Sequence, residues 1–106
     1  MDVAKLKETI LQRDALDLND DFGIEKCWEI ETEILSSDIP GAIEFLKTCS
    51  EAEFSWVAEV FPDVISATKS RELYQAMWER YESLESSEYK ELNLVDLKYA
   101  KDALPD

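Results

Sequence analysis

The sequence predicts an all-α protein of five or six short helices packed as antiparallel hairpins. The chain of 106 residues contains two glycines and three prolines, which argues against a turn-rich β architecture. Apolar residues make up 45% of the chain, enough for a hydrophobic core and too many for a disordered protein. They recur at three- and four-residue spacing, as on one side of a helix, and no segment alternates like a strand. We expect one domain over residues 1–106.

The first helix is predicted over residues 2–13. Val3, Leu6 and Ile10 repeat there at helical spacing, and Asp2 is placed to cap the helix or to lie in its first turn. The polar segment LDLNDDFG then separates this helix from the next.

The second helix is predicted over residues 24–36, with one apolar and one acidic side. Glu25, Glu29 and Glu33 follow at four-residue steps and therefore line one ridge. Like charges at this spacing destabilise an isolated helix slightly, so the ridge needs tertiary support or a partner. Glu31 falls on the apolar side, where we expect a hydrogen bond or ion pair to a neighbouring helix rather than a functional role.

Capping residues mark the next two helices. Ser37 or Asp38 is expected to begin the third helix. Ser50 and Glu53 have the spacing of a capping box and predict the start of the fourth. Pro62 should break or kink that helix, because proline lacks the N–H that a helix interior requires.

The C-terminal part of the chain is expected to hold the remaining helices. Residues 63–68 predict one more short helical turn, and Ser70 predicts the cap of a fifth helix with a broad aromatic side. Asn93 is expected to cap a sixth helix after the polar stretch SSEYKE. The aromatic residues of the fifth helix are Tyr74, Trp78 and Tyr81.

Charge is the most distinctive property of the composition. Twenty-five acidic residues against 11 basic ones give a net charge of −14, and residues 14–33 hold eight acids against Lys26 alone. A field of this sign disfavours nucleic acid and anionic membranes as partners and accelerates encounter with a basic protein. A merely solvated acidic surface is the alternative.

The residue inventory argues against an enzyme. The chain has no histidine, which removes the usual general base and the commonest metal ligand, and it has no glycine-rich phosphate loop. The segment 17–21 imitates the start of a calcium-binding EF-hand loop, but Phe22 and Trp28 stand where that loop needs glycine and glutamate. We therefore expect no catalytic residues, no cofactor and no metal.

Two further expectations concern the cysteines and the compartment. Cys27 and Cys49 are too few for a disulfide framework and lie among apolar residues, so we expect both in the core. Neither a signal peptide nor a membrane-spanning run is recognisable, which favours a cytoplasmic location.

One segment resembles a known family. Residues 54–81, FSWVAEVFPDVISATKSRELYQAMWERY, are similar to the Trp, Glu-Val-Phe, Asp and Thr-Lys-Ser pattern of small helical immunity proteins carried beside bacterial contact-dependent growth inhibition toxins and other polymorphic toxins. The resemblance implies a helical-hairpin, HEAT-like fold that binds and blocks a cognate toxin domain in the cytosol. Many such toxins are nucleases with basic substrate sites.

Charge and resemblance together predict an immunity protein whose acidic surface occupies the basic cleft of a toxin, as a monomer that forms a 1:1 complex. Trp28 and Trp56 are expected to pack in the interior rather than anchor the partner. The alternatives are an acidic adaptor or DNA-mimic regulator of a host basic protein, and a structural subunit that dimerises through its aromatic helix. The expected partner-binding residues are Asp20, Asp21, Glu25, Glu29, Glu33, Glu59 and Asp63.

Overall fold

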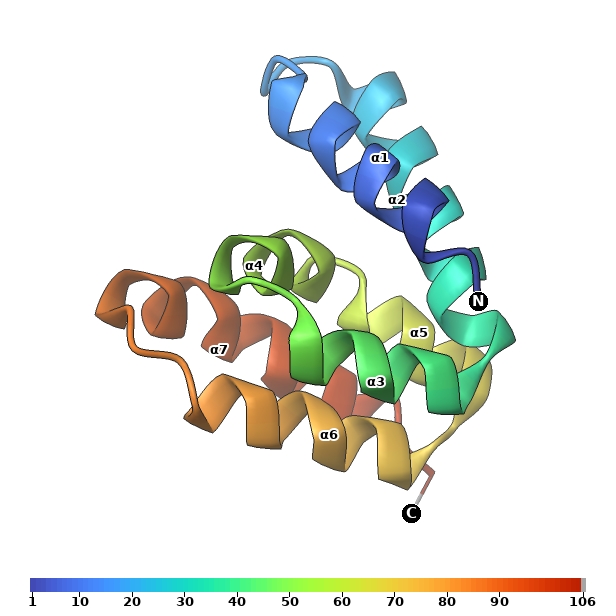
Figure 1. The fold of residues 1–106 in the computed structure, drawn as a ribbon, viewed down its shortest axis with the longest axis vertical. Coiled ribbons are helices and arrows are strands. Elements are labelled where there is room, and N and C mark those ends of the chain that lie inside the picture. The colour runs from blue at the N-terminus through green and yellow to red at the C-terminus, as the bar shows by residue number, and fades with distance from the viewer. Residues whose placement is uncertain (106) are drawn as a thin grey trace.

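The computed structural model describes residues 1–105 and is built of α helices, with no strand among these residues (Figure 1). The all-α prediction is confirmed, but the predicted number of five or six helices is too low, because the described chain forms seven. These are α1 (Val3–Ala15), α2 (Asp21–Ser37), α3 (Ile39–Thr48), α4 (Glu51–Ala58), α5 (Phe61–Thr68), α6 (Arg71–Glu82) and α7 (Ser87–Asp102).

The additional helix arises around Pro62. The chain turns after α4, and Pro62 then lies in the first turn of α5, where its missing N–H leaves no helical hydrogen bond unmade. The break was predicted, whereas the short turn expected over residues 63–68 is a separate helix of eight residues. Val64 and Ile65 of this helix are buried.

Most helix starts follow the predicted caps. Asp2, Asp38 and Ser70 each accept a backbone hydrogen bond at the start of a helix, and Ser50 with Glu53 forms the full capping box of α4. The start of α2 is earlier than predicted. The cause is Asp20, whose side chain accepts from the Gly23 backbone and so begins the helix at residue 21.

The predicted start of the last helix is wrong. Asn93 lies in the middle of α7 and is buried, and Ser86 caps the helix instead by accepting from the backbone of Tyr89. The polar stretch before Asn93 is therefore helical. The ring of Tyr89 packs against the core and stabilises this first turn, an effect that local polarity does not reveal.

The helices form two connected groups. α1 and α2 lie side by side as an antiparallel pair, and α3 to α7 lie together on one side of this pair (Figure 1). Both helices of the pair contact the second group, because α2 packs on α5 and α3 and α1 packs on α4. Within the second group, α7 packs against α4, α5 and α6. The Cα radius of gyration of 12.7 Å is the value expected for a compact domain of this length.

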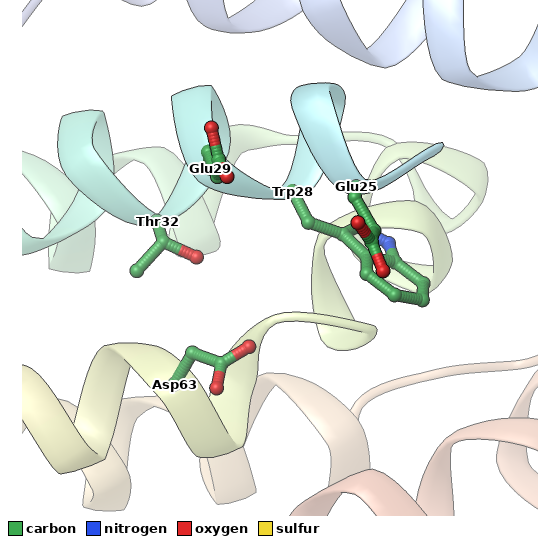
Figure 2. A pocket seen from close by; sticks show the side chains of 5 residues that line it. All are labelled: Glu25, Trp28, Glu29, Thr32 and Asp63. Carbon is green, nitrogen blue, oxygen red and sulfur yellow. The ribbon is translucent and has the colours of Figure 1, made fainter. Parts of the chain in front are cut away.

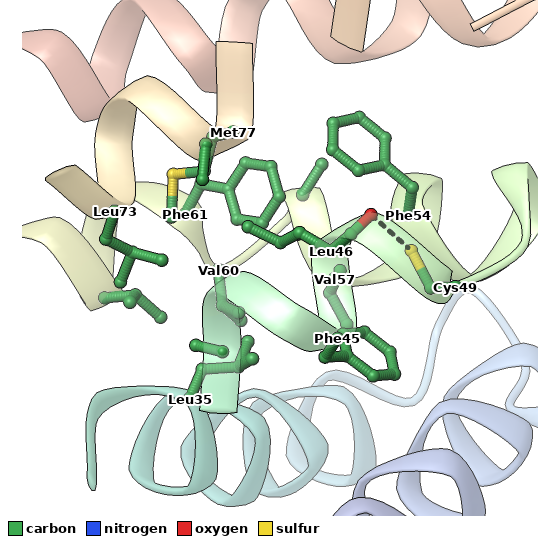
Figure 3. Close-up of a cluster of buried hydrophobic side chains, with 14 of the residues drawn as sticks. Leu35, Phe45, Leu46, Cys49, Phe54, Val57, Val60, Phe61, Leu73 and Met77 are labelled. Carbon is green, nitrogen blue, oxygen red and sulfur yellow. Dashed lines mark hydrogen bonds between the residues drawn. The ribbon is translucent and has the colours of Figure 1, made fainter. Parts of the chain in front are cut away.

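The hydrophobic core receives buried side chains from all seven described helices, and Figure 3 shows its part around α3, α4, α5 and α6 with Leu35 of α2. Phe54 and Phe61 meet edge to face at its centre, with ring centroids 5.3 Å apart. Cys27 and Cys49 are both buried and free, which confirms their predicted place. The Cys49 thiol contacts the Leu46 carbonyl at 3.6 Å, the interaction drawn as a dashed line in Figure 3.

The aromatic side of α6 packs largely within the chain. Trp78 contacts Tyr74 and Tyr81 edge to face and donates a hydrogen bond to the Tyr74 hydroxyl. Tyr81 donates to the Lys90 carbonyl of α7 at 3.1 Å. A homodimer formed through this side of α6 stays a prediction. None of the helices in residues 1–105 combines the length and apolar character needed to cross a bilayer.

Candidate functional site

The acidic ridge predicted on α2 faces solvent. Glu25, Glu29 and Glu33 are all exposed, and none of them forms an ion pair with another group of residues 1–105. Asp20 and Asp21 stand at the start of the same helix, where the positive end of the helix dipole stabilises negative charge. The first turn of α2 thus stabilises its own acids, while the three glutamates further along form no ion pair within residues 1–105.

A hollow of about 280 Å³ lies between α2 and α5, and it brings Asp63, another predicted partner-binding residue, next to the ridge. Asp63 reaches into it from α5 toward Thr32 of α2, and the indole of Trp28 lines one end beside Glu25 (Figure 2). Glu25 and Glu29 complete the lining. The fold therefore brings three predicted carboxylates from two helices around one depression, and Glu33 lies one turn further along α2.

Glu59 is engaged within the chain. Its carboxylate receives two hydrogen bonds from Arg13, Nε to Oε1 at 3.0 Å and Nη2 to Oε2 at 2.9 Å, and one from Trp28 Nε1 at 3.2 Å. The Arg13 guanidinium also lies over the ring of Trp56, 4.8 Å from its centroid. This cluster ties α1, α2 and the end of α4 together. A contact of Glu59 with a partner stays a prediction, and its observed role is structural.

Both tryptophans pack as expected. Trp28 and Trp56 are partly buried against the hydrophobic core, and each also contributes to the cluster around Arg13. Each tryptophan keeps one edge in a surface hollow, so packing does not remove either from solvent completely.

Glu31 differs from its prediction. It is 0% exposed, and neither carboxylate oxygen has a hydrogen-bond partner among the described residues, so the expected ion pair or hydrogen bond is absent. Burial raises the pKa of Glu31 to about 8; nearby Glu59 adds to this rise and Arg13 opposes it. Glu31 is therefore mostly protonated at neutral pH. Arg13 lies near two carboxyl groups, that of Glu59, with which it pairs, and that of the neutral Glu31.

Two exposed apolar side chains beside the ridge were missed by the sequence analysis. Phe22, at the start of α2, is 79% exposed, and Leu18, in the preceding connection, is 81% exposed. Phe22 and Glu29 are seven residues apart and so share one face of the helix. Two exposed apolar groups close together beside a row of charges are candidate anchors for a partner. The signal was present in LDLNDDFG, but the helix was expected to begin at residue 24, so Phe22 was not placed on a helix face.

Within residues 1–105, acidic and cysteine side chains do not gather in groups of three that could hold a metal ion. No protein-family model, curated protein or solved structure matches this chain.

Proposed function

We propose that this protein is an immunity protein that binds a cognate toxin domain in the cytoplasm and neutralises it without catalysis. The toxin is expected to be a nuclease with a basic active-site cleft. The observation that carries the proposal is the unpaired acidic ridge of α2, which continues across the hollow to Asp63 of α5. Self-repulsion among these carboxylates costs folding stability, and a basic partner would turn that cost into binding energy.

The geometry of the ridge fits a cleft that binds nucleic acid. Four-residue steps place the glutamates about 6 Å apart along the helix axis, a regular row of negative charge on a rigid support. Such a row stands in for phosphates in a basic groove. Its field accelerates association, and salt slows that association because it screens exposed charges.

Apolar contact completes the proposed interface. Phe22 and Leu18 lie beside the acids, and interfaces usually place a few apolar anchors inside a polar rim. We take the chain as a monomer that forms a 1:1 complex, and its helical pairs as an irregular HEAT-like arrangement. The similarity of residues 54–81 to immunity proteins supports the same proposal.

The test has two steps. The intact protein is used as bait in lysate of its source organism, and bound proteins are eluted with increasing salt and identified. A basic toxin domain encoded by a neighbouring gene is the expected capture. A housekeeping DNA- or RNA-binding protein in its place would overturn the immunity proposal in favour of the acidic adaptor or DNA-mimic regulator.

The second step compares two variants of equal net charge. In the ridge variant Glu25, Glu29 and Glu33 are all replaced by Gln; in the control variant Glu44, Glu72 and Glu82, exposed on α3 and α6, are replaced in the same way. We expect the ridge variant to lose at least about tenfold in affinity for the captured partner, which is roughly 1.4 kcal/mol, and the control to lose much less. Equal losses would show that total charge, and not the ridge, determines binding.

A further inference from the structure

A second hollow, between α4 and α7, lies outside the acidic ridge. Its volume is about 330 Å³. Its walls combine aromatic, apolar, amide and carboxylate groups, a mixture typical of a binding site that fixes the orientation of one ligand group. The lining residues are Ser55, Trp56 and Glu59 from α4 and the turn after it, and Tyr89, Leu92, Asn93 and Asp96 from α7.

Asn93 provides an unused hydrogen-bond donor in this hollow. The residue is 2% exposed, and its Oδ1 accepts from the Ser55 hydroxyl at 3.4 Å. Its amide nitrogen Nδ2 has no hydrogen-bond partner among the described residues. An unpaired buried donor is costly in a folded protein. A ligand that offers a carbonyl oxygen at this position would remove that cost.

Asp96 provides an unpaired carboxylate one turn further along α7. It is partly buried and makes no ion pair with the described chain. Burial, and secondly the charge of Glu59, raise the pKa of Asp96 to about 6. Its carboxylate is therefore ionised at pH 7 although its surroundings oppose the charge. A cation placed beside Asp96 would stabilise its ionised form and so oppose the effects of burial and of the Glu59 charge.

The remaining walls suit a cation with an apolar stem. Trp56 and Tyr89 are half-buried aromatic residues, and the Trp56 ring already contacts one guanidinium, that of Arg13. Leu92 is 59% exposed at the rim and can cover an alkyl chain. A guanidinium is more weakly hydrated than an ammonium and stacks on aromatic rings, so these walls favour arginine over lysine.

We propose that the hollow between α4 and α7 binds an arginine side chain of the protein partner. The guanidinium pairs with Asp96, the alkyl stem packs against Trp56 and Leu92, and a backbone carbonyl of the same partner segment accepts from Asn93. This inference rests on the proposed function in taking the partner to be a basic protein. It adds a specific recognition point to the general attraction of the acidic ridge.

The test uses the intact chain and a small probe, N-acetyl-arginine amide, without any partner. The probe has one cationic side chain, two carbonyl groups and no charged ends. NMR titration follows the side-chain signals of Asn93, Trp56 and Asp96. The matched control probe is N-acetyl-citrulline amide, which keeps the shape and removes the charge. We expect saturable shifts with the arginine probe, a lower pKa of Asp96 in the complex, and at least about tenfold weaker binding of the citrulline probe.

Two variants separate a specific site from general attraction. Asp96→Asn should remove at least about tenfold of the affinity for the arginine probe and should fold, because it replaces a carboxylate that burial disfavours. Asp102→Asn, at an exposed position at the end of α7 that lines neither hollow, removes the same charge and should leave binding nearly unchanged. Equal shifts with both probes, no site-specific shift, or equal effects of the two variants would each overturn the inference. The proposed function would then still stand on the capture experiment, which does not depend on this probe.

Discussion

The stability of the protein should fall as the pH rises through neutrality, and the buried Glu31 should cause most of that fall. Glu31 lies on α2 with both carboxylate oxygens buried and unpaired. The groups near it are the carboxylate of Glu59, the guanidinium of Arg13 and the thiol of Cys27. Replacing Glu31 with Gln keeps the size of the side chain and removes the proton that titrates.

The sign follows from where the proton is bound. Glu31 has a pKa near 4.5 when exposed and about 8 in the folded protein. Between these values the folded state holds a proton that the unfolded state releases, so stability decreases as pH rises. Below pH 4.5 the stabilisation is fully present, and above about pH 8 it is fully lost. At about 1.4 kcal/mol per pH unit, the ceiling on the total loss is roughly 5 kcal/mol.

The window from pH 6.5 to 8.5 isolates Glu31 from the other shifted groups. The pKa of Asp96 is raised to about 6, so its contribution is mostly complete below this window. The pKa values of Asp38 and Glu51 are lowered, so their contributions are lost only as the solution becomes acidic. Burial raises the pKa values of Cys27 and Cys49, so their unfolded thiols ionise first and add a smaller loss of stability near pH 8.5, the top of the window. Glu31 alone should therefore lower the free energy of unfolding by roughly 2 kcal/mol across the window.

Urea unfolding followed by tryptophan fluorescence, at pH 6.5, 7.5 and 8.5 under reducing conditions, measures this loss. Glu31→Gln should give nearly the same free energy of unfolding at all three values. Glu33→Gln, which removes an exposed carboxylate two residues away, should keep the decline of the unchanged protein. A decline of equal size in the protein and in Glu31→Gln would refute the reasoning, because another group would then hold the proton.

Two further predictions concern the arginine cluster and the exposed phenylalanine. Arg13→Met keeps the stem of the side chain but leaves Glu59 without its cation, so the free energy of unfolding should fall by roughly 3 kcal/mol. Adding Glu59→Gln to that variant should restore part of the loss in urea unfolding, and no restoration would exclude the pair as its cause. Phe22→Ser should change stability by less than about 0.5 kcal/mol, because Phe22 is exposed, yet weaken binding of the captured partner at least about fivefold. Unchanged affinity in a titration would exclude Phe22 as an anchor.

Local signals along the chain predicted most of the helices. The capping box at Ser50 and Glu53, and the caps at Asp2 and Ser70, act within one helical turn, so the neighbouring residues are enough to recognise them. The start of α7 was assigned to the wrong residue, because Ser86 and Asn93 both have the chemistry of a cap and the local sequence does not decide between them. Asn93 has the chemistry of a cap, but packing of Tyr89 and burial of Asn93 against α4 place it inside the helix.

The ridge on α2 was equally predictable, since four-residue spacing fixes a common helix face whatever the rest of the chain does. The surroundings of these acids could not be predicted from the spacing. Asp63 lies beside the ridge because α5 packs on α2. Glu59 does not belong to the ridge, because its carboxylate pairs with Arg13, which is 46 residues away in the sequence.

Composition and spacing alone thus determined an acidic, helical chain with one charged helix face, because charge and helical periodicity are properties of the residues themselves. Only the tertiary structure decided which carboxylates are free, paired or protonated. The ionisation of Glu31 and Asp96 depends on burial and on nearby charges, and the pairing of Glu59 depends on its contact with Arg13. Both arise when segments far apart in the sequence pack together.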